Sequence, residues 1–371
     1  MQVDLDCFFV PARLIASVPG ALGYWPRRRL VLLMTVAPAP DEQPQRVQPL
    51  FVTWPLEVPS ATALGAARRG APGWPVAGRL ATIVNASAVA ALIVDDGLAS
   101  PDSAELGSAA HRELVDALVE GFDAGPPSLV AVWGISDIIA GAEWFTLCGS
   151  PERGLIGDPL HDPATRERTE RGQEVQSSRE AVVQSLAPDR QLIEQIRKHN
   201  ASAGDPDSRV PGRRRSAAHN VSEHSARQSL RAALELLGCC QDERRLSAVQ
   251  LACLAGLIAD SSVRDCLFAV ANTARAAVAE ATWVMLVRGL TGPDRAHAAV
   301  LLAYFAAVRG DTVLASIAVG IALEAGPHYE IAVLLDAAIE IAIPPQKLLR
   351  LAHKSARIAA ALGVEIPQSS A

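Results

Sequence analysis

The stretch RGDTVLASIAVGIALEAGPHYEIA, residues 309–332, predicts a helical hairpin in the C-terminal part of the chain. Gly310 ends the first helix tightly, because glycine readily adopts the left-handed conformation that follows helix C-termini. Ala315 and Ala322 lie seven residues apart on one face of the second helix, where small side chains let two helices approach closely. Pro327 restarts the chain after that helix. We therefore expect two closely packed antiparallel helices here.

The chain around this hairpin, residues 221–371, predicts helices throughout. Apolar residues recur at the helical period in successive runs that only short breaks separate. Short breaks between helices make neighbours antiparallel. We therefore predict an all-α C-terminal domain.

The spacing in the hairpin, with Leu302 and Ala303 one helix earlier, is similar to that of a tetratricopeptide repeat. This repeat is a helix pair of about 34 residues that stacks into solenoids. The large aromatic residues of the repeat are replaced here by Ala299, Ala306 and Val319. The resemblance implies tetratricopeptide-like packing; an alanine-rich bundle without a groove is the alternative.

The N-terminal part, residues 1–150, predicts an α/β domain with a mixed, partly parallel sheet. Short apolar runs bounded by Pro, Gly or charged residues indicate buried strands within residues 27–38, 49–56, 87–97 and 128–137. A helical pattern separates the last two runs, and such a crossover joins parallel strands. The first two runs are expected to form a hairpin at the edge of the sheet.

Residues 151–220 show little periodic apolar pattern and are expected to form an irregular connecting segment. Ser177 or Ser178, followed by Glu180, is typical of a helix N-terminus, and Pro188 of the start of another helix. The mixture of Gly, Pro, Ser and Arg at residues 201–218 predicts a flexible linker.

Charge disfavours nucleic acid as a general partner. Residues 1–150 hold 15 Asp and Glu against 9 Arg, which accounts for the whole net charge of −6.

No basic leader and no apolar run of membrane-spanning length is present, so we expect a cytoplasmic protein without a membrane partner. The six cysteines form no CxxC pair and the eight histidines are scattered, so no metal site is expected and the histidines are expected to be solvated. The sequence does not predict the oligomeric state.

Blocks spread over most of the chain resemble an uncharacterised actinobacterial family, domain of unknown function 4192. They are LIASVPGALGYWPRRRLVLL, VAALIVDD, GDPLHDPATRERTERGQEVQSSREAVVQSLAPD and LLAYFAAVRGDTVLASIAVGIALEAGPHYEIAVLLDAAIEIAIPP, in that order. The resemblance supports the architecture and a cytoplasmic place. It implies no activity and no catalytic residues.

Three carboxylates are the candidates for chemistry. Asp95 and Asp96 end one predicted strand, and Asp137 follows the next. Because ligands bind at the carboxyl ends of parallel strands, these residues could bind a metal or act as acid and base. The alternative is that they cap the loops that follow the strands. No motif for a nucleotide, a dinucleotide or a serine nucleophile is present, and no cofactor is expected.

Two weaker sites are also candidates. Ser178 and Arg179 could bind an anion at a helix N-terminus, although helix capping alone explains the serine. Arg213, Arg214 and Arg215 could contact an acidic partner or nucleic acid, or could be solvated residues of the linker.

The sequence favours a non-catalytic interaction or regulatory protein that binds a protein partner through its helical domain. The alternative is an enzyme or a small-ligand-binding protein that uses the carboxylates at the sheet edge. Whether the protein is an enzyme stays open at this point.

Overall fold

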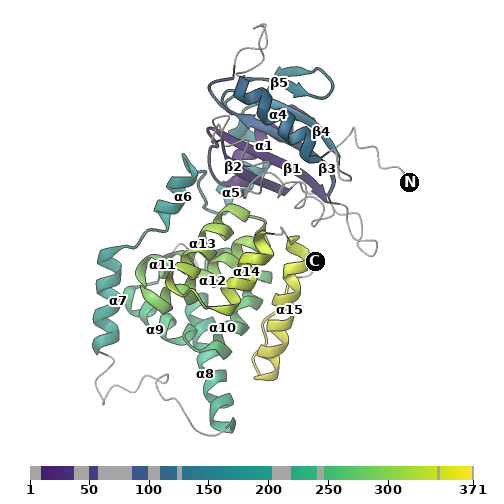
Figure 1. Cartoon of the computed structure of the whole chain (residues 1–371). Coiled ribbons are helices and arrows are strands. Elements are labelled where there is room, and N and C mark those ends of the chain that lie inside the picture. Colours follow the sequence, from purple (N-terminus) through teal and green to yellow (C-terminus); the bar gives the residue numbers. More distant parts are fainter. Residues whose placement is uncertain are drawn as a thin grey trace. The chain divides into compact units, whose positions relative to one another are not determined.

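The computed structural model describes residues 10–36, 50–56, 86–98, 109–122, 128–202, 219–239, 246–340 and 343–369. The chain divides into two compact units, Met1–Val182 and Val183–Ala371 (Figure 1). Residues 203–218 of the expected linker (201–218), which include the arginine cluster, lie outside the described residues, whereas residues 201 and 202 are the last two of a helix.

The first unit is an α/β structure around a six-stranded sheet with the order β2-β1-β3-β4-β5-β6. The strands of this unit are β1 (Arg29–Val36), β2 (Leu50–Pro55), β3 (Ala86–Val94), β4 (Leu129–Ile135), β5 (Glu143–Cys148) and β6 (Arg153–Leu155). Only β3 and β4 are parallel among these strands, and α4 (Ala109–Phe122) lies between them in the sequence. The predicted mixed, partly parallel sheet and its β1–β2 hairpin are confirmed.

The central strands explain why the sheet forms. Residues 30–34 of β1 and 88–94 of β3 are almost completely buried, although successive side chains of a strand point to opposite faces. Both faces of the sheet are therefore covered, and continuous apolar runs suit such strands better than an alternating pattern does.

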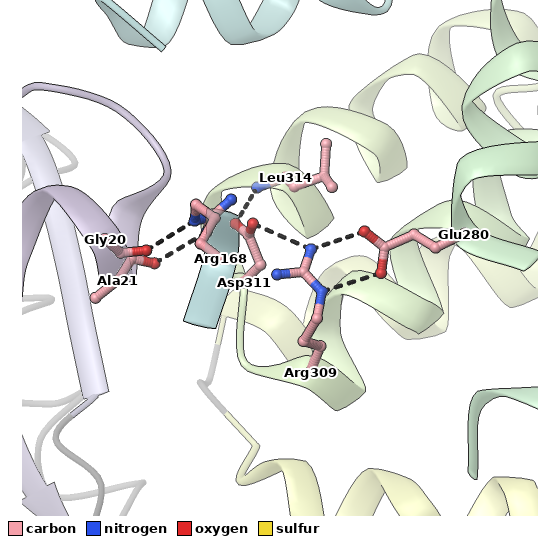
Figure 2. Close-up of polar contacts among 7 residues, drawn as sticks. All are labelled: Gly20, Ala21, Arg168, Glu280, Arg309, Asp311 and Leu314. Atoms are coloured by element: carbon pink, nitrogen blue, oxygen red, sulfur yellow. Dashed lines mark hydrogen bonds and ion pairs between the residues drawn. The ribbon is translucent and has the colours of Figure 1, made fainter. Parts of the chain in front are cut away.

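Helix α1 (Pro11–Leu22) packs against α5 (Pro163–Glu170), although about 140 residues separate them in the sequence. A Cβ atom on Gly20 would lie 2.3 Å from the backbone nitrogen of Thr165, so only glycine allows this approach. Arg168 donates hydrogen bonds to the carbonyls of Gly20 and Ala21, over 2.8 and 3.4 Å, at the end of α1 (Figure 2). A cation is favourable at this negative end of a helix.

The remaining elements of the first unit lie in the segment that the sequence predicted to be irregular. The 3-10 helix η2 (Pro159–His161) precedes α5, and α6 (Arg179–Ser185) follows it, with the boundary between the two units inside α6. An isolated parallel bridge joins Tyr24 to Gln176, with 2.9 Å from Trp25 N to the Gln176 carbonyl. This bridge ties the chain after α5 to the end of α1.

The second unit is helical and contains the predicted all-α domain of residues 221–371. It also contains the helix of residues 190–202, which lies in the segment that the sequence predicted to be irregular. Its helices are α7 (Arg190–Ser202), α8 (His219–Gly238), α9 (Ala248–Ile258), α10 (Ser261–Leu267), η3 (Phe268–Asn272), α11 (Ala276–Gly289), α12 (Gly292–Arg309), α13 (Thr312–Ala325), α14 (Glu330–Glu340) and α15 (Pro345–Ala361). Helix α12 packs against α11, α13, α14 and α15, so it forms the centre of this unit (Figure 1).

The hairpin predicted from residues 309–332 is formed by α12 and α13. Gly310 follows α12 with a φ of 88°, in the left-handed region that favours glycine. Ala315 and Ala322 are fully buried, and Ala315 clusters with Ala306 and Ala307 of α12. Small side chains therefore line the contact between the two helices.

We expect Gly20→Ala to destabilise the first unit by about 1–3 kcal/mol, because the added methyl group overlaps the backbone of α5. Urea unfolding followed by tryptophan fluorescence tests this, since five of the six tryptophans lie in residues 1–150.

The matched control is Gly121→Ala in α4, where an added Cβ meets no atom within 4 Å. The control should be neutral or stabilising by up to about 1 kcal/mol. Equal midpoints for the two variants would contradict the close packing of α1 on α5.

Candidate functional site

Asp95 follows β3 and forms a buried pair with His111 of α4. Asp95 Oδ2 lies 2.9 Å from His111 Nε2, and the two residues are only 6% and 3% exposed. The backbone N–H of Asp95 donates to the Ile135 carbonyl of β4 over 3.1 Å. The pair therefore sits at the carboxyl ends of the two parallel strands, where the sequence placed its candidate chemistry.

The surroundings of Asp95 favour its charged form. Burial pulls the pKa of Asp95 upward, but hydrogen bonds from His111 and from the Gly97 N–H outweigh it and hold the pKa below its usual value. An ionised carboxylate thus fixes α4 to the end of β3. The expectation that the histidines are solvated is wrong for His111, because Asp95 supplies the partner that a buried histidine needs.

The three candidate carboxylates do not converge. Asp96 is exposed and follows Asp95 directly in the chain. Asp137 instead accepts a hydrogen bond from the Ile138 N–H over 2.9 Å and lies 3.6 Å from Arg27 Nη2. Within the described part of the chain, no group of three or more His, Cys, Asp or Glu side chains could hold a metal ion. The geometry favours local capping for Asp137 and helix anchoring for Asp95.

The predicted anion site at the start of α6 is occupied by a carboxylate of the same chain, that of Glu180. Ser178 Oγ accepts a hydrogen bond from the Ala181 N–H over 3.1 Å, while Arg179 is half-buried. Glu180 has a lowered pKa, caused first by its own backbone N–H, then by Ser178 and by Arg29, whose Nη2 lies 3.1 Å away. Glu180 thus takes the place that an external anion would occupy in the first turn.

The arginine cluster Arg213, Arg214 and Arg215 lies outside the described residues, so its role as a partner site stays a prediction.

The sequence did not predict an ion network at the end of α12, although Arg309 and Asp311 of this network lie in the stretch that predicted the hairpin. Arg309 binds both carboxylate oxygens of Glu280 in α11, over 2.8 and 3.0 Å, and Asp311 Oδ2 over 3.2 Å (Figure 2). Asp311 also caps α13 by accepting from the Leu314 N–H over 2.9 Å. Desolvation lowers the pKa of Arg309, but Asp311 and Glu280 together raise it above its usual value.

The network is structural. Glu280 and Asp311 are buried, and the guanidinium neutralises one of their two charges. Glu280 lies on the buried face of α11 together with Trp283 and Val287, and a glutamate within such an apolar row is the sequence signal that could have suggested a buried partner.

Helix α14 follows the hairpin of α12 and α13, and fewer of its residues are buried than in either of those helices. Only Ala332 and Leu335 of its residues are buried, whereas Val333 is 49% and Leu334 is 70% exposed. Leu334 and Val333 thus form an apolar patch on the surface of the second unit. We call the exposed row Glu330, Val333, Leu334, Ala337 and Glu340 the α14 face.

The α14 face is held firmly at both ends of the helix. Tyr329, just before α14, packs its ring against His297 of α12, with the centroids 5.5 Å apart, and under the Arg264 guanidinium at 5.4 Å. Burial raises the pKa of Tyr329 to about 12 and lowers that of His297. Near the other end, Ile339 packs on the alanine cluster of α12 and α13. The face is therefore presented by a fixed helix.

Helix α15 presents a second exposed row, of one charge. Its members are Lys347, Arg350, Lys354 and Arg357, and the helix contains no Asp or Glu. Leu348 of α15 packs on the same alanine cluster as Ile339, and the Tyr304 hydroxyl of α12 donates to the Leu348 carbonyl over 2.9 Å. We call this row the α15 face.

The profile of one protein family, described as a domain of unknown function (DUF4192), matches residues 11–346. The chain belongs to this family. The match runs from α1 to the second residue of α15. It therefore includes α14 but none of the four bases of the α15 face. No curated protein and no solved structure matches the chain. In the described part of this family member, no helix is both long and apolar enough to cross a membrane.

We expect Asp95→Asn to destabilise the first unit by about 1–3 kcal/mol at pH 7, because it removes a charge-assisted hydrogen bond to His111. The folded pKa of Asp95 is lowered, so its contribution is full above the unfolded value of about 3.9 and is lost as the pH falls through the folded value. Urea unfolding at pH 7, 5 and 3 should therefore show a difference from the parent protein that shrinks only below about pH 4.

The control for this series is Asp116→Asn, which removes an exposed carboxylate of α4, the helix that contains His111. An equal effect at both positions, or a difference that is independent of pH, would contradict the role of the buried pair.

We expect Arg309→Leu to destabilise the second unit by about 3–5 kcal/mol, because it removes the guanidinium that binds the buried carboxylates of Glu280 and Asp311. Loss of the circular dichroism signal at 222 nm in urea measures this. The control, Arg288→Leu, removes a half-exposed partner of Asp189 and should cost less than about 1 kcal/mol. Similar costs for the two variants would show that the network contributes little.

Proposed function

We propose that this protein is a non-catalytic interaction protein whose helical unit binds a protein partner through the α14 face. The observation that carries the proposal is the exposure of Leu334 and Val333 on a helix that is fixed at both ends. Leaving large apolar side chains in water is unfavourable, and contiguous apolar patches mark interaction sites. A rigid helix also loses little conformational freedom on binding.

The chemistry of the α14 face suits recognition of another helix. Val333, Leu334 and Ala337 form its apolar centre, and Glu330 and Glu340 stand at its ends. An apolar centre with a charged rim is the usual anatomy of a protein interface. Helices commonly dock through residues spaced three and four apart, which is the spacing of this row.

The sheet edge supports this proposal more than a catalytic one. Asp95 and His111 are buried against each other, and Asp137 is engaged by Ile138 and Arg27. The proposal extends to tetratricopeptide-like stacking of the α12–α13 pair, which the small residues at their contact support. It also extends to residence in the cytoplasm of an actinobacterium, which the family resemblance and a count of 31 Arg against 3 Lys support.

Substitution Leu334→Asp tests the proposal. The full-length chain is used as bait in an extract of its native cells, and stoichiometric partners are quantified by mass spectrometry. We expect the variant to lose at least tenfold of the bound partner, because a carboxylate in the centre of an interface is desolvated without a cation.

The control bait is Val249→Asp, which places the same charge on an exposed valine of α9 in the same unit. Partner recovery with the control should equal that of the parent chain. Recovery that is equal with both variants, or that yields nothing beyond chaperones with the parent chain, contradicts the proposal.

A further inference from the structure

The α14 face and the α15 face are complementary in charge. The first carries Glu330 and Glu340 at its ends, and α14 contains no Lys or Arg. The second is basic along its whole length and has no acid. One helical unit therefore carries both an acidic surface with an apolar centre and a basic surface.

The bases of the α15 face have little compensation within the chain. Asp265 lies close enough to attract Lys354, but the side chains of Lys347, Arg350 and Arg357 form no hydrogen bond or ion pair with the described part of the chain. Bases three and four residues apart on one helix face repel each other. An acidic partner laid along α15 would relieve this repulsion.

The spacing of the charges also matches. Glu330 and Glu340 are ten residues apart, as are Lys347 and Arg357, and ten residues of helix span about 15 Å. Two such helices laid side by side place one base at each acid. The two central bases, Arg350 and Lys354, then lie over the apolar centre of the α14 face, where their aliphatic stems can cover it.

Within one chain the two faces do not satisfy each other, since none of the ion pairs in the described ranges joins α14 to α15. Both helices are nevertheless fixed to the same alanine cluster on α12, through Ile339 and Leu348. A two-fold axis repeats each contact. A surface that carries both an acidic face and a basic face can therefore bind a second copy of itself.

We propose that this chain forms a two-fold symmetric dimer in which the α14 face of each copy lies along the α15 face of the other. This inference rests on the proposed function, because it names a second copy as the partner of the α14 face.

The dimer is expected to be weak. Helices α14 and α15 are about 16 and 25 Å long and about 10 Å wide, so their faces offer about 400 Å² per copy. Stable interfaces bury about 800 Å² per partner. Since the contact is also rich in charge, its dissociation constant should be micromolar and should rise with salt.

Sedimentation velocity of the full-length chain, from about 1 to 200 μM, tests the inference. We expect a concentration-dependent shift from monomer to dimer at 0.05 M NaCl, and at least a tenfold weaker dimer at 0.5 M. The double variant Lys347→Glu/Arg357→Glu and the double variant Glu330→Lys/Glu340→Lys should each be monomeric, because each places like charges opposite one another.

Mixing the two double variants is the most specific test of the proposed pairing. Both contacts of the mixed dimer again pair acids with bases, so the mixture should dimerise although neither component does. Renewed association also shows that both variants are folded. The matched control, Arg190→Glu/Arg197→Glu, reverses two exposed bases of α7 and should dimerise like the parent chain.

A chain that is monomeric at every concentration overturns the inference. So does a dimer that the charge reversals leave intact, or a mixture of the two double variants that stays monomeric. If the chain is monomeric but Leu334→Asp still abolishes binding of a different protein, the proposed function holds and the second copy is excluded as the partner.

Discussion

The close approach of helices through small side chains is the constraint on which the second unit depends. Only 4% of the residues are aromatic, so large rings fill little of its core. Ala306, Ala307 and Ala315 instead bring α12 and α13 together, and Ile339 and Leu348 pack on the same cluster. Since α14 and α15 both take their positions from this cluster, the alanines also set where the exposed faces of these helices lie.

A polar network closes the same hairpin. Arg309 at the end of α12 and Asp311 at the start of α13 both belong to the turn around Gly310, and Glu280 adds the neighbouring helix. Three consecutive residues thus combine a left-handed turn, a helix cap and a buried cation. In the first unit, Arg168 has a comparable role at the end of α1. Arg309 and Arg168 therefore both join elements of the fold that are separate in the sequence.

The sequence predicted the features that follow from local pattern. The parallel β3–β4 pair was predicted because its strands are continuous apolar runs, and the α12–α13 hairpin because glycine and alanine mark it. Helix α1 was missed, since Pro19 inside it breaks the helical pattern, and β5 and β6 were missed because they are short and lie at the sheet edge. The partners of Asp95 and Arg309 come from other elements, 16 and 29 residues away, and no local pattern reveals them.

The packing of α1 on α5 has a consequence for the order of events during synthesis. Gly20 and Arg168 are 148 residues apart, so the first unit cannot close until the ribosome has released the chain well beyond α5. Contacts of such long sequence separation slow folding, whereas helical hairpins form quickly from neighbouring residues. Helix α1 is made first but finds its place late, and until then its apolar side must be shielded by nascent-chain chaperones or by transient contacts.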